Sequence, residues 1–416
     1  MQLRYRFRLY PAPGQQQALA RAFGCARVVF NDALRAREQA RAAGPAYPSD
    51  GELSKRVITE AKKTPERAWL GEVSAVVLQQ ALADLNTAYR NFFASVSGGR
   101  KGRVVAAPRY RSRKDRRQAI RFTRNARWKI TAGGRLRLPK VGDVPVRWSR
   151  TLPSVPSSVT VIRDAAGRYF ASFVVETADE PLPRTEAEVG VDLGLAHFAV
   201  LSDGRKISSS RFLRRAERRL RKAQQALSRK TKGSANRRKA AARVARLHAR
   251  VADARRDHHH KLSTQLVRDN QAVYVENLCV SGLARTRLAK SVHDAGWSQF
   301  VAMLEYKAAR HGRTFAKVDR WFPSSKLCGA CGTVAESMPL HIRTWACACG
   351  AVHDRDVNAA NNILAAGRAD RLNACGGTAR PPAQRKAGPS ETGSRRSAAH
   401  AARLNPRPSG RGARQW

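Results

Sequence analysis

The chain has 416 residues, of which 79 are Lys or Arg and 31 are Asp or Glu, so its formal net charge at neutral pH is +48. A surface this basic adheres to polyanions, which favours a nucleic-acid partner and argues against a small neutral substrate. Apolar residues make up 42% of the chain, enough for a real core, and the length predicts two to four domains, with no apolar run that could span a membrane or serve as a signal peptide.

The N-terminal part begins as a strand and continues as helices. Apolar and Arg side chains alternate over residues 3–9, which predicts a strand with one basic face. Apolar residues then recur at intervals of three and four over 19–33 and again over 78–92, which predicts two helices that each bury one stripe. In this helical unit, Gln79 and Gln80 have amides able to pair with adenine edges, although surface solvation would explain them equally well.

A basic segment and a set of short strands follow. Residues 98–125 carry eleven Lys or Arg and one Asp. This composition suits a loop that tracks phosphates, with Arg109, Arg111 and Arg113 as candidate contacts, although a solvated linker would look the same. Short strand patterns separated by turns over 120–176 predict a small antiparallel sheet or barrel. Because one strand precedes the helices and the others follow them, the helical unit is expected to be inserted into that barrel.

The second half of the chain has the pattern of a covered α/β sheet. Strands over 189–202, 272–278 and 313–319 are too continuously apolar to be half exposed. Between them, residues 211–250 hold sixteen Lys or Arg and one Glu, which predicts a basic helical hairpin. The candidate nucleic-acid contacts near its break are Lys232, Arg237 and Arg238. Residues 371–416, rich in Pro, Gly, Ser, Ala and Arg, are expected to be a disordered basic tail.

Two carboxylates lie in these apolar strands, Asp192 in the first and Glu276 in the second. A buried carboxylate is costly unless it is paired or bound to metal, and a salt bridge would satisfy either one alone. A third acid comes from the sequence HDRD at 353–356, at the start of a helical pattern. Three convergent carboxylates without a cation on their strands would repel one another unless divalent cations lay between them. Two Mg²⁺ ions held in this way can hydrolyse a phosphodiester, which is the arrangement of RNase H-like nucleases.

The two acids of HDRD are not equivalent. Asp354 could cap the helix by accepting hydrogen bonds from its free N–H groups. Asp356 would then point from the first turn toward the sheet. The residue pattern leaves open which of the two is the third ligand.

Four of the seven cysteines form a predicted metal site. Cys328 and Cys331 form a CxxC pair, and Cys347 and Cys349 form a CxC pair fifteen residues later. This spacing predicts one structural Zn²⁺, and a reducing compartment argues against disulfides. The short CxC spacing could loosen its half of the site.

The remaining cysteines and a run of histidines are expected to have no chemical role. Cys25 and Cys279 lie in apolar contexts and are interpreted as small core residues. Cys375 is interpreted as an idle thiol of the tail. The three consecutive His at 258–260 point to different helix faces and are interpreted as mostly solvated.

Several segments resemble TnpB, a family of transposon-encoded RNA-guided DNA endonucleases related to type V CRISPR effectors. The segments GVDLGLAHFAVLSDG, VYVENL and SSKLCGACG with WACACGAVHDRDVNAANNIL are similar, in order and spacing, to the three RuvC motifs and the zinc ribbon of that family. FGCARVVFND, PRYRSR and DAGWSQFVAMLEYKAARHG are similar to further family segments. The resemblance covers about residues 1–365.

The resemblance implies roles for the residues singled out above. Asp192, Glu276 and Asp356 would be catalytic and would bind two Mg²⁺ ions, and the four cysteines would bind one structural Zn²⁺. The implied domains are a wedge-like β-barrel (1–10 and 115–180), a helical recognition unit with the basic loop (11–114), an RNase H-like RuvC nuclease domain (186–322 and 351–370) and a zinc ribbon inserted into it (323–350).

The resemblance also implies partners. A transposon-derived guide RNA would select double-stranded target DNA by base pairing, while the protein reads a short adjacent motif. We expect one protein per RNA, no membrane, and a prokaryotic cytoplasm in which the protein associates with the nucleoid. The alternatives are a strand-joining transposase, because RNase H-like sites serve both activities, a non-catalytic guide-RNA-binding repressor, and a basic zinc-ribbon protein of the ribosomal sort. The sequence pattern predicts no dimerisation coiled coil, which argues against the strand-joining transposase. The presence of all three acids argues against the repressor.

Overall fold

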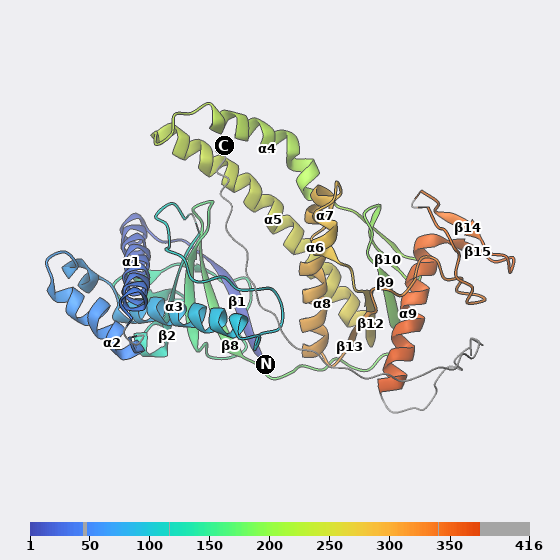
Figure 1. Ribbon diagram of the computed structural model, residues 1–416, viewed down its shortest axis with the longest axis horizontal. Helices are drawn as coiled ribbons and strands as arrows, with labels where there is room; N and C mark the ends of the chain where they lie inside the picture. Colours follow the sequence, from blue (N-terminus) through green and yellow to red (C-terminus); the bar gives the residue numbers. More distant parts are fainter. Residues whose placement is uncertain (45–47, 116, 340, 375–416) are drawn as a thin grey trace, which may run out of the picture. The chain divides into compact units, whose positions relative to one another are not determined.

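The structure is a computed structural model that describes residues 1–44, 48–115, 117–339 and 341–374 (Figure 1). Among the helices of these residues, none is long and apolar enough to cross a membrane. Helix α9 (Arg355–Ala374) includes the first four residues of the predicted tail, so the tail prediction is wrong for 371–374. The rest of the predicted tail, with Cys375, lies outside the described residues.

The first sheet joins the N-terminal strand to strands that follow the helical unit. Its order is β2-β7-β8-β1-β6, and its members are β1 (Gln2–Leu9), β2 (Gln118–Thr123), β6 (Val146–Arg147), β7 (Ser158–Arg163) and β8 (Tyr169–Glu176). All its pairings are antiparallel, and β1 pairs with β8 from Gln2 opposite Glu176 to Leu9 opposite Tyr169. A second antiparallel sheet contains β3 (Lys129–Ile130), β4 (Leu136–Leu138) and β5 (Gly142–Val144). Closure into a barrel stays a prediction.

The helical unit lies between β1 and β2 in the chain. It contains α1 (Pro13–Ala43), α2 (Asp50–Ser54) and α3 (Ala75–Val96), with a π-helical turn at Lys55–Glu60 and 3-10 turns at Ala61–Lys63 and Ala68–Glu72. A further 3-10 turn, Arg124–Ala126, follows β2. Both predicted apolar stripes are buried and share one core with the first sheet; they include Leu19, Phe23, Phe30, Leu78, Leu82 and Leu85.

The third sheet carries the two strand carboxylates. Its order is β11-β10-β9-β12-β13, formed by β9 (Glu188–Asp192), β10 (His197–Leu201), β11 (Lys206–Ser208), β12 (Ala272–Glu276) and β13 (Thr314–Val318). β12 runs parallel to β9 and β13, whereas β10 is antiparallel to β9 and β11. Figure 1 shows this sheet between α8 (Trp297–Arg310) and α9.

Helices cover both faces of the third sheet. Val273 and Val275 of β12 belong to the core that contains side chains of α5 (Ala235–Asp269) and α8, whereas Tyr274 packs with Ile363 of α9. The alternation of β12 side chains between two cores explains why its sequence is apolar throughout. The prediction of a covered sheet is therefore confirmed.

Helix α9 approaches this sheet unusually closely because glycines lie at the contact. A Cβ atom at Gly190 of β9 would lie 2.1 Å from the carbonyl oxygen of Ala360 on α9, and a Cβ atom at Gly367 of α9 would lie 2.1 Å from the ring of Tyr274 on β12. Side chains larger than hydrogen at these two positions would separate the helix from the sheet. Gly190 lies two residues before Asp192, so the close contact is adjacent to the candidate site.

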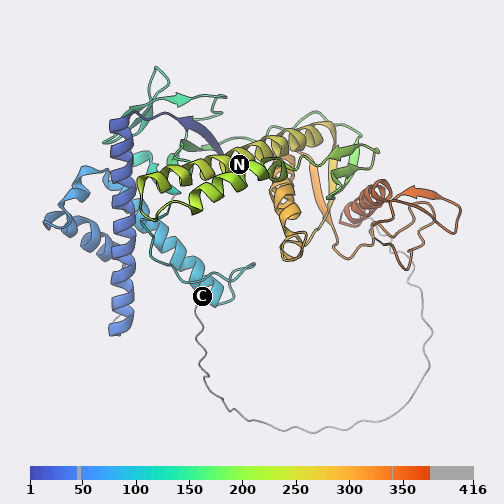
Figure 2. The same ribbon diagram turned by 90° about the horizontal axis from the view of Figure 1, so that it is seen from above.

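The basic hairpin consists of α4 (Phe212–Ser228) and α5, which lie side by side in Figures 1 and 2. The short helices α6 (Val280–Leu283) and α7 (Ala289–Ala295) follow β12.

The interpretation of residues 258–260 as solvated is wrong for His259. Its ring is 1% exposed, stacks on Phe198, and lies 3.0 Å from the carbonyl oxygen of Ala295 through Nε2. The cause is that this face of α5 packs on the third sheet.

Candidate active site and metal centre

Asp192 and Glu276 end two neighbouring parallel strands. Val191 of β9 lies opposite Val275 of β12, so the next residue of each strand, Asp192 and Glu276, leaves the sheet at the same edge. Both carboxylates are partly buried. Ligand and metal sites of open α/β sheets lie at this carboxyl edge.

Asp356 joins them from the first turn of α9. Burial, followed by the charges of Glu276 and Asp356, raises the pKa of Asp192 to about 7, whereas Arg355 and Arg343 oppose this shift. Burial also raises the pKa of Glu276. The structure therefore brings the three predicted acids into electrostatic contact.

Asp354 caps α9, as the HDRD pattern suggested. Its Oδ1 accepts hydrogen bonds from the backbone N–H groups of Asp356, at 3.1 Å, and Val357, at 3.0 Å. Its Oδ2 accepts a hydrogen bond from Lys206 at 2.5 Å. Burial acts to raise the pKa of Asp354, but the Lys206 and backbone hydrogen bonds outweigh it and lower the pKa. Asp354 is thus the residue that caps the start of the helix, and the carboxylate of Asp356 does not form these capping hydrogen bonds.

Arg343 is a residue that sequence reasoning missed. Its Nη1 lies 3.0 Å and 3.3 Å from the two carboxylate oxygens of Asp356. The carboxylate-bearing strands indeed lack a cation, but Arg343 and Lys206 reach the acids of HDRD from other segments. In the sequence Arg343 lies between the two cysteine pairs, and nothing in that position indicates a contact with Asp356.

The four predicted cysteines lie together. Their Sγ atoms are all within 4.8 Å of one another, with 3.8 Å between Cys328 and Cys349 and 3.6 Å between Cys331 and Cys347. Thiolates on one tetrahedral Zn²⁺, with bonds of about 2.3 Å, lie roughly 3.8 Å apart, so the cluster fits this ion. The short CxC spacing removes neither of its thiols from the cluster. All the cysteines of the described chain are free, so no disulfide competes there.

The surroundings of the cluster connect it to the candidate active site. β14 (Thr344–Ala346) and β15 (Val352–Asp354) form an antiparallel hairpin that begins next to Arg343 and ends at Asp354. His353 of β15 lies 3.0 Å from the Sγ of Cys328 through Nε2. Hydrogen bonds with Thr333, followed by those with Cys328 and Cys349, lower the pKa of Cys331 to about 6, which favours the thiolate that zinc requires. A backbone hydrogen bond with Cys349 acts to lower the pKa of Cys347, but burial and the other three thiols outweigh it and raise this pKa to about 12.

The interpretation of the other two described cysteines is half right. Cys25 is buried, as expected. Cys279 is exposed, so its interpretation as a core residue is wrong. It follows β12 at the point where the chain leaves the sheet, and its apolar neighbours in the sequence pack there without it.

The eight candidate nucleic-acid contacts differ in their surroundings. Arg109, Arg113, Lys232, Arg238 and Gln79 are exposed, and Gln80 is partly buried. Arg111 packs over the ring of Phe30 at 3.8 Å from its centre and pairs with Asp84 at 3.4 Å. Arg237 donates hydrogen bonds to the carbonyl oxygens of Leu227 and Lys230 at the end of α4. Arg111 and Arg237 therefore have structural contacts, which the sequence pattern did not reveal.

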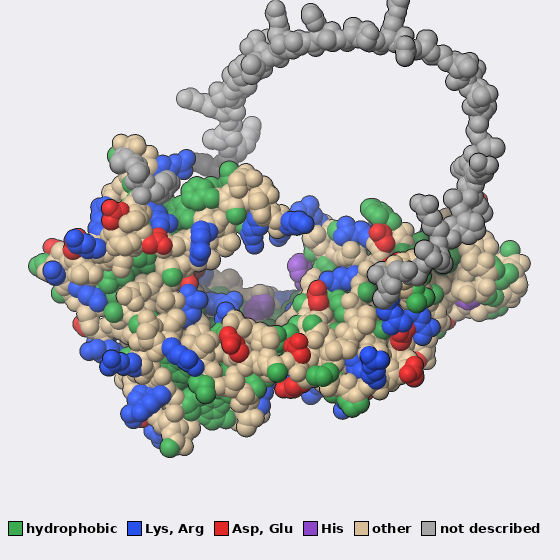
Figure 3. All heavy atoms as spheres, turned by 90° about the horizontal axis from the view of Figure 1, so that it is seen from below, with side chains coloured by type: hydrophobic (Ala, Val, Ile, Leu, Met, Phe, Trp, Pro, Cys, Tyr) green, Lys and Arg blue, Asp and Glu red, His purple; other side chains and the backbone are tan. Residues whose placement is uncertain are grey.

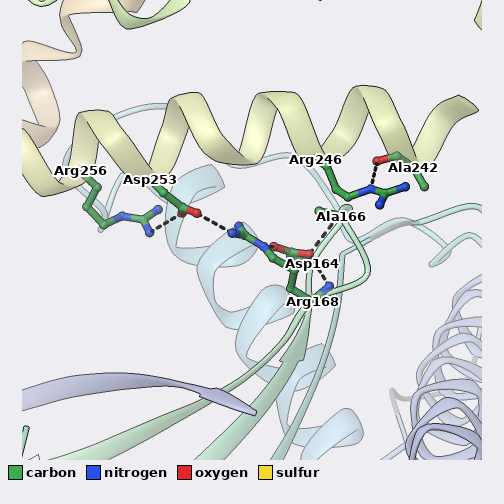
Figure 4. Close-up of polar contacts among 7 residues, drawn as sticks. All are labelled: Asp164, Ala166, Arg168, Ala242, Arg246, Asp253 and Arg256. Atoms are coloured by element: carbon green, nitrogen blue, oxygen red, sulfur yellow. Dashed lines mark hydrogen bonds and ion pairs between the residues drawn. The ribbon is translucent and has the colours of Figure 1, made fainter. Parts of the chain in front are cut away.

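The turn between β7 and β8 is braced against α5 by ion pairs (Figure 4). Arg168 pairs with both Asp164 and Asp253, and Arg256 lies 3.7 Å from Asp253. A groove of about 510 Å³ lies between this turn and α5. Burial, together with the charges of Arg256 and Arg168, lowers the pKa of Arg6 in the same groove. Asp164 and Asp253 on the same wall partly balance these positive charges.

A second groove, of about 610 Å³, runs between α4 and α5. Ala223, Ala226 and Leu247 line it together with five cations, Arg219, Lys222, Arg243, Arg246 and Arg250. Within the described part of the chain, none of these five cations has an acidic partner. On the face shown in Figure 3, Lys and Arg side chains form separate patches scattered over the surface.

Comparison with protein-family models identifies three segments. "Probable transposase" (OrfB_IS605) matches residues 172–287, "Cas12f1-like, TNB domain" matches residues 297–363, and "Helix-turn-helix domain" (HTH_OrfB_IS605) matches residues 1–45. The first two matches contain the three carboxylates and the four cysteines between them.

Relatives and solved structures match nearly the whole chain. A "Putative RNA-guided DNA endonuclease" of Streptomyces pristinaespiralis is 49% identical over 382 residues, which are 91% of this chain and 92% of the relative. The "Putative RNA-guided DNA endonuclease InsQ" of Escherichia coli (strain K12) is 31% identical over 390 residues, 89% of this chain and 93% of the relative. A chain of the "Cryo-EM structure of the Cas12f1-sgRNA-target DNA complex" has a TM-score of 0.51 at 14% identity and covers 83% of this chain and 82% of that one, which shows a shared fold. With relatives of this identity along more than 85% of its length, the chain belongs to the TnpB family of IS605 OrfB-type proteins.

Proposed function

We propose that the protein is an RNA-guided DNA endonuclease whose catalytic residues are Asp192, Glu276 and Asp356. The observation that carries the proposal is the convergence of two strand-end carboxylates and one helix-start carboxylate at one sheet edge, where burial and mutual repulsion raise the pKa of Asp192. The names of the Streptomyces and Escherichia relatives support the same activity.

The donor set at this edge fits two Mg²⁺ ions. Carboxylate oxygens are the ligands that Mg²⁺ prefers, and cations between the acids would relieve their repulsion. When bound, such ions supply an activated water and stabilise the leaving oxygen of a phosphodiester. The chain's own part is to position the ligands: β9 and β12 hold Asp192 and Glu276, and the Asp354 cap holds the turn that carries Asp356. Arg343 adds a positive charge that can stabilise a bound phosphate.

We assign one structural Zn²⁺ to Cys328, Cys331, Cys347 and Cys349. It would hold the segment that presents Arg343 and leads into Asp354, without taking part in cleavage. We also retain the domain boundaries proposed from the sequence, with 323–350 as the zinc ribbon inserted into the nuclease domain.

The partners we propose are a transposon-derived guide RNA and double-stranded target DNA. Base pairing by the RNA would supply sequence specificity, and the protein would contact backbones with its +48 charge. The α4–α5 groove offers five cations that pair with no acid of the described residues, and Arg109 and Arg113 extend from the basic loop. Gln79 and Gln80 on α3 stay our candidates for reading the adjacent DNA motif.

The test begins with the RNA that co-purifies with the protein. Sequencing its 3′ portion identifies the guide, and the complex is then incubated with a matching duplex in Mg²⁺ or in a chelator. We expect cleavage that needs both the guide match and the cation, and that Asp192→Ala abolishes without loss of RNA. Asp203→Ala is the control, because Asp203 is an acid of the β10–β11 turn that pairs with Arg205. Undiminished cleavage by Asp192→Ala would refute the site, and joined strands in place of free ends would support a strand-joining transposase.

A further inference from the structure

Two buried asparagines of α9 hold the loop that contains Cys328. Asn358 and Asn362 are 5% and 4% exposed. The Oδ1 of Asn358 accepts a hydrogen bond from the N–H of Gly329 at 3.0 Å, and its Nδ2 donates one to the carbonyl oxygen of Leu327 at 2.7 Å. The Nδ2 of Asn362 donates to the carbonyl oxygens of Leu327 and Ser324, both at 2.8 Å. Four hydrogen bonds thus connect two side chains to the main chain on both sides of Cys328.

The contact leaves no room for adjustment. A Cβ atom at Gly329 would lie 2.9 Å from the Oδ1 of Asn358 and 3.2 Å from the Oδ1 of Asn362. Glycine therefore lets the loop backbone rest directly on the two amides. The asparagines are four residues apart and face the same side of the helix, whereas Asn361 between them is exposed.

The helix that carries these two asparagines begins at the candidate active site. Asp356 lies two residues before Asn358 in the first turn of α9. Helix α9 also contacts the sheet at Gly190, and Asp356 at its start contacts Arg343. The start of α9 is therefore fixed from two sides, by the sheet and by the cysteine loop. A buried amide that loses its partner is costly, so order in the loop and order in the helix depend on each other.

We propose that Asn358 and Asn362 are positioning residues through which the metal-bound cysteine loop fixes the first turns of α9 and thereby Asp356. With zinc bound, the main-chain groups around Cys328 are held in place and satisfy both amides. Without zinc, the loop can leave, the amides lose their partners, and the helix start loosens. Such coupling is reciprocal, so loss of the asparagines also weakens zinc binding, by about 10- to 100-fold if they act as typical outer-shell partners. The consequence for cleavage rests on the proposed function, but the coupling itself does not.

The experiment compares the wild type, the double variant Asn358→Ala/Asn362→Ala, and Asn361→Ala, which alters an exposed amide of the same helix. Hydrogen exchange of backbone amides over 355–362 is measured in the zinc-loaded protein and after addition of a chelator. In the wild type and in Asn361→Ala, we expect slow exchange with zinc and fast exchange after chelation. In the double variant, we expect fast exchange with zinc present, and zinc release at about 10- to 100-fold lower chelator concentration.

An isosteric change separates hydrogen bonding from packing. Asn362→Asp keeps the shape of the side chain but turns its donors into acceptors that face two carbonyl oxygens. We expect zinc retention in Asn362→Asp to be no better than in Asn362→Ala, whereas a packing role predicts retention close to wild type. Slow exchange in β9 and β12 verifies that each variant is folded. If the double variant does not fold, Asn358→Asp, which keeps the acceptor for the N–H of Gly329, replaces it in the exchange and zinc measurements.

Two results would overturn the proposal. One is zinc-dependent protection of 355–362 in the double variant equal to that of the wild type, and the other is wild-type zinc retention in Asn362→Asp. If the wild type itself does not cleave guided DNA, the proposed function fails, while the exchange and zinc measurements still decide the coupling. If it does cleave, the asparagine variants are expected to lose cleavage in the order in which they lose protection at the start of α9.

Discussion

Gly190→Ala is a substitution that changes no charge and that should lower both the stability and the cleavage rate of the protein through a steric clash. Gly190 lies in β9, two residues before Asp192, under the backbone of α9. The added methyl group would lie 2.1 Å from the oxygen of Ala360, 2.7 Å from the nitrogen of Leu364 and 3.0 Å from the Cβ of Leu364. None of these atoms is the end of a flexible side chain, so relief requires the helix or the strand to move.

The size of the effect follows from these distances. Ordinary contact begins at 3.4 Å, so α9 must move away from β9 by more than about 1 Å. Inserting a methyl group into a packed core costs about 1–3 kcal/mol, and we expect the upper end because backbone must move. Asp356 moves with α9, and a displacement of about 1 Å in a catalytic group can reduce a rate about 100-fold. Both stability and cleavage should therefore fall.

The assay is urea unfolding followed by single-turnover cleavage of guided DNA at a temperature at which the variant is folded. Gly24→Ala is the control, because a Cβ there meets no more than the end of the Arg27 side chain, at 4.0 Å. Gly24 lies inside α1, where alanine should raise the free energy of unfolding by up to about 1 kcal/mol. An unchanged unfolding midpoint and cleavage rate in Gly190→Ala would refute the close contact between α9 and β9.

Three further predictions concern the acids, the cysteines and a histidine. Asp356→Asn should abolish cleavage, whereas Asp354→Asn should cost at most about 1 kcal/mol of stability, since Asn is also a good cap, and equal loss of cleavage in both would mean that Asp354 also binds metal. Freshly purified reduced protein should contain one equivalent of zinc, and Cys328→Ser should lower the thermal midpoint and the zinc content together; metal analysis that finds no zinc contradicts this. Burial lowers the pKa of His259 to about 4. Between about pH 6.5 and pH 4 the unfolded chain therefore binds a proton at this residue that the folded chain does not bind. The free energy of unfolding should fall by at most about 3 kcal/mol as the pH drops toward 4. His259→Gln should flatten this pH dependence of urea unfolding, whereas His248→Gln, at an exposed position, should not.

The sequence by itself determined the local features of this protein. The spacing of Leu19, Phe23 and Phe30 was enough to predict a buried helical stripe, because a helix presents every third or fourth residue to one side. Asp192 and Glu276 stood out because a carboxylate in an apolar strand needs a partner, and the four cysteines stood out because their spacing matches the ligands of one ion. Each of these inferences depends on residues that are close in the sequence.

Only the tertiary structure decided which side chains meet and which are buried. It placed Arg343 on Asp356, buried His259, exposed Cys279, and occupied Arg111 and Arg237 in structural contacts. The physical reason is that burial and pairing depend on which elements pack together, and that packing is set by shape, as at Gly190, where the lack of a side chain lets α9 lie against the sheet. A basic or apolar residue has the same appearance in the sequence whether it faces solvent or a neighbouring helix.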